Sequence, residues 1–179
     1  YLPRGTASPN IGVEDVAREL SHRSLGGNGL HQHRGRAVEL AAGCGGEPLG
    51  YLYTNTDHTS FKLVMEWRWA PGAAARLGKV PNSGVLMRVN GEPKPKGVPR
   101  AYEAQLQAGN AGDLYGFWGL PLEGDAERRR EAKGHELLGD MVGVRKTAAA
   151  EKPEGEWNVY EITLDGPSLV VFVNGKKVN

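Results

Sequence analysis

The sequence holds a single cysteine, Cys44, among 179 residues. One cysteine excludes an intrachain disulfide and any cysteine-rich metal site. No apolar run is long enough for a transmembrane helix, and the N-terminus lacks the charged-then-apolar order of a signal peptide. The formal net charge is only +1, which gives no electrostatic argument for a nucleic acid or a membrane surface as partner. We therefore expect no nucleic acid and no membrane among its partners.

Glycine and proline are plentiful instead, with 26 and 11 residues, and this composition favours a turn-rich fold over a helix bundle. A chain of this length is enough for one domain, residues 1–179, with a substantial core. Apolar and polar residues alternate in several segments, as in half-buried strands, at 61–69, 83–89, 101–107, 156–164 and 168–173. The pattern predicts an all-β sandwich of two antiparallel sheets.

Two short segments have the spacing of helices, residues 13–20 near the N-terminus and the charged stretch 126–133. Residues 1–48 carry the weakest pattern of the chain, and within them the segment from Ser24 to Gly35 is irregular and predicts a loop. Asn174-Gly175 is a strong hairpin signal, yet only four residues follow it. We therefore expect the final strands to be missing and the edge of 168–173 to be incompletely covered.

The most informative segment runs from Tyr102 to Tyr115. Its alternation places Glu103, Gln105 and Gln107 on one face of a strand. Carboxylate and amide groups on an open face are suited to hydroxyl-rich ligands such as sugars. The turn that follows would return Asp113 and Tyr115 to the same rim.

Four sequence blocks resemble the 3-keto-disaccharide hydrolase family: 61–69, 82–88, 102–113, and 151–162 followed by 172–175. The resemblance implies a concanavalin-like jelly roll that acts on carbohydrates and is often secreted, hence an extracellular or periplasmic location. It also implies glycoside substrates whose C3 hydroxyl has been oxidised to a ketone. No cofactor follows from it.

A retaining glycosidase needs two carboxylates about 5–5.5 Å apart, but the position two residues after Glu103 is Gln105. A 3-keto-glycoside needs only one base, because the ketone acidifies the proton on C2 and the group on C1 can then leave. We expect Glu103 to be this base, with Arg88 and Gln105 binding hydroxyls or stabilising the enolate oxygen. A plain cross-strand ion pair between Glu103 and Arg88 is the alternative.

Other candidates are weaker. His135 is a candidate second acid or base, and the candidate sugar contacts beyond the polar strand are Asn82, Asp113, Tyr115 and Trp118. The pair His31 and His33 lacks a completing ligand, so we predict no metal site.

Two other classes of function remain open. The same polar face would serve a non-catalytic carbohydrate-binding module. Alternatively, the short C-terminal strand would be completed by a partner chain or a second copy, as in a structural or assembly domain. Turnover of a 3-keto-glycoside separates the first class from an enzyme, and the mass in solution tests the second.

Overall fold

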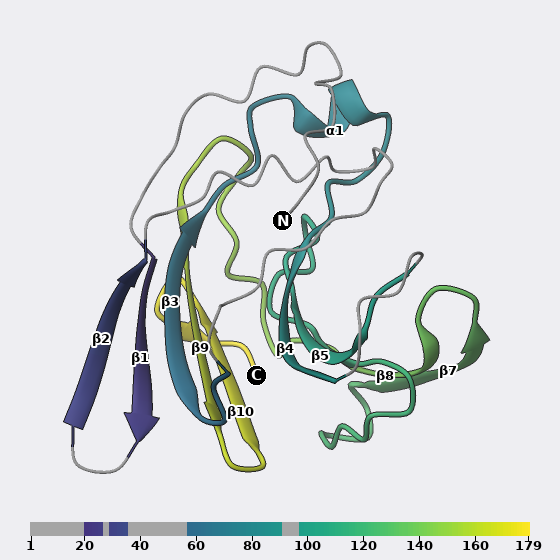
Figure 1. The fold of residues 1–179 in the computed structure, drawn as a ribbon. Helices are drawn as coiled ribbons and strands as arrows, with labels where there is room; N and C mark the ends of the chain where they lie inside the picture. Colours follow the sequence, from purple (N-terminus) through teal and green to yellow (C-terminus); the bar gives the residue numbers. More distant parts are fainter. Residues whose placement is uncertain (1–19, 27–28, 36–56, 91–96) are drawn as a thin grey trace, which may run out of the picture.

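The computed structural model describes residues 20–26, 29–35, 57–90 and 97–179. They form two antiparallel sheets that face each other as two layers (Figure 1). Sheet A has the order β11-β10-β9-β3-β1-β2 and sheet B the order β4-β5-β6-β8-β7. The strands of sheet A are β1 (Leu20–Gly26), β2 (Gly29–Gly35), β3 (Phe61–Trp67), β9 (Asn158–Asp165), β10 (Ser168–Val173) and β11 (Lys176–Lys177). Those of sheet B are β4 (Gly84–Asn90), β5 (Arg100–Gln105), β6 (Leu114–Gly116), β7 (Arg129–His135) and β8 (Gly139–Val144). The predicted β-sandwich of two antiparallel sheets is confirmed.

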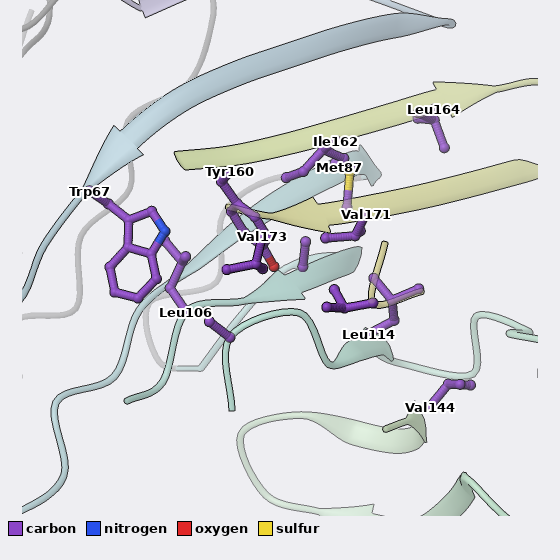
Figure 2. Close-up of a cluster of buried hydrophobic side chains, with 13 residues drawn as sticks. Trp67, Met87, Leu106, Leu114, Val144, Tyr160, Ile162, Leu164, Val171 and Val173 are labelled. Carbon is purple, nitrogen blue, oxygen red and sulfur yellow. The ribbon is translucent and has the colours of Figure 1, made fainter. Parts of the chain in front are cut away.

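The core lies between the two sheets (Figure 2). Strand β9 shows most clearly how alternation in the sequence produces the core. Tyr160, Ile162 and Leu164 are buried, while the residues between them are partly exposed. This is the two-residue period of a strand with one face on a core. Sheet B contributes the other side of the core, with the buried side chains Met87, Ala104, Leu106, Leu114 and Val144. Side chains of β3, β9 and β10 thus pack against those of sheet B to form the core.

Two expectations about local structure were wrong. Residues 129–135 form β7 rather than a helix, because residues 129–132 pair with β8 and ladder hydrogen bonds outweigh a weak local helical preference. The segment expected as a loop at 24–35 lies in the β1–β2 hairpin, which extends sheet A beyond β3. The helix expected at 13–20 falls outside the described residues except for Leu20, where β1 begins.

The one helix in the described ranges is α1 (Ala73–Leu77), which no pattern in the sequence indicated. It lies above the sheets at one end of the sandwich (Figure 1). Gly72 and Gly78 flank it in left-handed conformations, which confine it to five residues. No helix among the described residues has the length and hydrophobicity to cross a bilayer.

The hairpin predicted at Asn174-Gly175 is present. Both residues have positive φ, 51° and 78°, as a type I′ turn requires. The return strand β11 has two residues, and Val178 beyond it is fully buried and donates its N–H to the Val171 carbonyl. The residues after the turn therefore cover the edge of β10 from Val171 to Val173.

The packing of β9 leads to a first prediction. Ile162→Ala should lower the free energy of unfolding by about 2–5 kcal/mol, because it leaves a cavity in a core position that is 0% exposed. Thr163→Ala, at the partly exposed neighbouring position, is the control and should change stability by about 0.5 kcal/mol or less. Urea unfolding measures both, and equal losses would contradict the assignment of β9 faces.

Candidate functional site

The candidate site lies on the outer face of sheet B, the face turned away from sheet A. Cross-strand pairing places Leu86, Glu103, Tyr115 and Gly143 in one row across β4, β5, β6 and β8. Each is the strand neighbour of a residue buried in the core, so the row points outward. The sandwich therefore places a carboxyl and a phenol side by side, between a leucine and a glycine.

Glu103 is a partly buried acid on this face. Its carboxyl lies over Gly84 of β4, so closely that any side chain at position 84 would collide with it. Glycine in a strand interior often marks such a close approach. Burial raises the pKa of Glu103 from 4.5 to about 7, since a charged carboxylate loses hydration there. Near neutral pH the group is thus poised between acid and base.

Tyr115 is the direct cross-strand neighbour of Glu103. Its ring lies over Gly143, where an added Cβ would come within 2.7 Å of Cε1. It is also parallel to the Phe117 ring, with centroids 6.0 Å apart and an interplanar angle of 5°. Burial, followed by the negative charges of Asp113 and Glu103, raises the pKa of the phenol. The hydroxyl therefore keeps its proton and is available as a hydrogen-bond donor.

The two glutamines expected beside Glu103 have local roles. Strand β5 ends at Gln105, whose Oε1 accepts the N–H groups of Leu106 and Gln107, both at 3.0 Å. Gln107 lies beyond the strand, and its Oε1 accepts from the Asn110 side chain. Both side-chain oxygens therefore stabilise the 106–113 loop, whereas the alternation of the sequence predicted a continuous displayed face.

Asp113 closes the same loop from its other end. Its side chain is only 7% exposed, and its Oδ1 accepts the Lys146 N–H at 2.9 Å. Its backbone carbonyl accepts the Gln105 N–H at 2.9 Å. Asp113 is near enough to influence Tyr115 through charge. The structure thus brings Glu103, Tyr115 and Asp113 together, as the sequence predicted for the rim.

Arg88 is directed elsewhere. It follows Met87 at an irregularity in the β4–β5 pairing and has a positive φ of 49°. Its guanidinium donates to the Gly166 carbonyl in the β9–β10 turn of the opposite sheet. Its described partner is therefore a backbone carbonyl of sheet A rather than the Glu103 carboxyl. A cross-strand ion pair is not found between the two in the described part of the chain.

The remaining candidates lie apart from the row. Asn82 is exposed just before β4. Trp118 and His135 both line a separate hollow, together with Gly119, Gly134, Gly139 and Asp140. No group of three or more His, Cys, Asp or Glu side chains suited to a metal ion is found in the ranges described.

Two residues of the site escaped the sequence reasoning, Gly84 and Gly143. Each lies inside a strand and provides the space that a functional side chain occupies. An isolated glycine within an alternating segment was the available signal. It did not reveal which neighbouring strand would approach, because the order of strands in the sheet is a tertiary property.

Comparison with known families gives one match. A model of the 3-keto-alpha-glucoside-1,2-lyase-like domain matches residues 21–179. The chain belongs to this family. Comparisons with curated proteins and with solved structures find no match. Membership of this family supports a carbohydrate-related role. The partly buried carboxyl of Glu103 on the outer face of sheet B agrees with such a role.

The burial of Glu103 predicts a pH-dependent stability. Its folded pKa lies above the unfolded value, so its stabilising contribution is complete below pH 4.5 and is lost as the pH rises toward 7. Glu103→Gln removes this loss. The stability of the variant relative to wild type should rise between pH 4.5 and 8 by up to roughly 3 kcal/mol.

Urea unfolding at the two pH values measures this difference. Glu156→Gln, at an exposed position, is the matched control, and its stability relative to wild type should be the same at both pH values. A constant difference between wild type and Glu103→Gln at both pH values would show that Glu103 titrates normally.

Proposed function

We propose that this protein cleaves 3-keto-glycosides by elimination across C1 and C2 followed by addition of water. The observation that carries the proposal is a single carboxyl on the outer face of sheet B, Glu103, whose pKa is raised by burial to about 7. A base with a pKa near the working pH is well suited to proton abstraction. The family match adds the substrate class, since its description names a 3-keto-glucoside lyase.

The proposed chemistry requires one base and one donor. The Glu103 carboxylate takes the proton from C2, which the C3 ketone acidifies, and an enolate forms. The enolate re-forms the ketone while a C1–C2 double bond develops and the bond from C1 to the glycosidic oxygen breaks. The departing oxygen takes up a proton, and water then adds with its oxygen on C1 and a proton on C2. The net result is hydrolysis without any change of oxidation state.

Tyr115 is the donor that the fold provides next to this base. It is the cross-strand neighbour of Glu103 and retains its proton, so it can donate to a developing negative charge on the substrate. This role replaces the one expected for Arg88 and Gln105, whose described contacts are with backbone groups. The two glycines beneath Glu103 and Tyr115 let both side chains lie low on the sheet. A sugar ring can then approach the row.

Turnover of 3-keto-trehalose tests the proposal. Wild type should release the leaving sugar, and Glu103→Gln should reduce kcat/KM by about 10²–10⁴-fold because it removes the base. The exposed Glu156→Gln should retain full activity. Below pH 7 the wild-type kcat/KM should fall tenfold per pH unit, since only the ionised carboxylate is active.

Running the reaction in D₂O distinguishes elimination from direct displacement. Elimination followed by hydration places deuterium on C2 of the product, whereas direct displacement at C1 leaves the original hydrogen there. The free 3-keto sugar incubated with enzyme corrects for later exchange. Sugar binding without any product would instead support a non-catalytic carbohydrate-binding module.

A further inference from the structure

A second concave site lies at the end of sheet B where the β7–β8 hairpin meets the segment after β6. It is an open hollow of about 470 Å³, lined by Trp118, Gly119, Gly134, His135, Gly139 and Asp140. Its size is within the range of small-ligand sites. Half of its lining residues are glycines, so backbone rather than side chains bounds much of the space.

The indole of Trp118 forms one wall and is held rigidly. Its Nε1 donates to the Val98 carbonyl at 2.8 Å, and its backbone N–H donates to the Leu138 carbonyl at 3.0 Å. The ring occupies the space that a side chain at Gly139 would need. Trp118 also has a left-handed φ of 56°, which bulky residues rarely adopt and which tends to persist at functional sites.

A hydrogen-bond donor and an acceptor also line the hollow, on His135 and Asp140. The His135 Nδ1 accepts the Leu137 N–H at 3.2 Å, so the ring proton is on Nε2 and can be donated. Asp140 accepts from the Gly134 N–H at 2.9 Å through Oδ1 and from Lys133 at 3.4 Å through Oδ2. Each carboxylate oxygen has a second lone pair available. An apolar ring, an N–H donor and a carboxylate acceptor together suit the alternating hydroxyls and C–H faces of a sugar.

The hollow is distinct from the row that contains Glu103. Tyr115 lies over Gly143 and Trp118 over Gly139, two positions of β8 that are four residues apart. Four strand residues span about 13 Å, and an even separation places both rings on the same face. A single sugar ring is shorter than this separation, so one ring cannot contact both aromatic residues.

We propose that the Trp118–His135 hollow is a second sugar-binding site, one that takes an uncharged pyranose unit of a glycoside. The Asp140 carboxylate disfavours an acidic sugar, and the donor and acceptor groups do not require an oxidised C3. This site goes beyond the proposed function, because it binds an unoxidised sugar and does not use Glu103.

The experiment follows trehalose, an unoxidised disaccharide, by calorimetry and by the NMR signal of the Trp118 indole N–H. Trehalose should bind wild type and Glu103→Gln equally and shift that signal. Gly134→Asn should weaken binding by about tenfold or more, because it introduces a side chain into the hollow. Position 134 has a φ of 64° and no atom within 4 Å of an added Cβ, and asparagine tolerates this conformation.

Gly166→Asn is the matched control, with a φ of 49° and equally open surroundings, but in the β9–β10 turn. It should bind trehalose as wild type does. His135→Ala, at an exposed position, should weaken binding without affecting the fold. An unshifted indole signal, unchanged affinity in Gly134→Asn, or equal loss in Gly166→Asn would overturn the second site. If wild type did not turn over 3-keto-trehalose, only the proposed function would be overturned, and the second site would stand.

Discussion

The packing of β9 against the inner face of sheet B positions every group of the candidate site. Tyr160, Ile162 and Leu164 fill the space beneath β5 and β6, and the Tyr160 hydroxyl donates to the Gln105 carbonyl at 3.0 Å where β5 ends. This buried hydrogen bond joins the two sheets at the base of the 106–113 loop. Because Ala104 and Leu114 must face this core, their neighbours Glu103 and Tyr115 must face outward.

Burial of the Glu103 carboxyl raises its pKa and opposes stability. The environment that raises its pKa to about 7 also makes the ionised form less favourable in the folded protein. The surrounding core compensates, since fully burying each large apolar side chain contributes about 1.5–3 kcal/mol. The fold thus tolerates a desolvated carboxyl at Glu103, because the other face of the same sheet packs on the core.

The loop from 106 to 113 is stabilised from several sides, which keeps its end, β6, in register with β5. Gln105 binds its first amides, and Glu151 accepts the Ala111 N–H at 3.2 Å. Asp113 in turn binds the Lys146 N–H. Polar residues that the sequence presented as ligand contacts therefore support the loop, and through it the position of Tyr115.

Sequence periodicity determined the strand segments of the core and the outward position of Glu103. The Asn174-Gly175 pair indicated the turn, and the resemblance of four sequence blocks indicated the family. Sequence reasoning could also place Tyr115 near Glu103, because a short turn joins their strands. It failed at 129–135, where pairing with β8 overrode local preference, and at Arg88, whose partner Gly166 is 78 residues away. Only the tertiary structure decided that Gly84 and Gly143 underlie the site and that Trp118 and His135 line one hollow. The physical reason is that alternation specifies which face a side chain occupies, while strand order and register specify its neighbours.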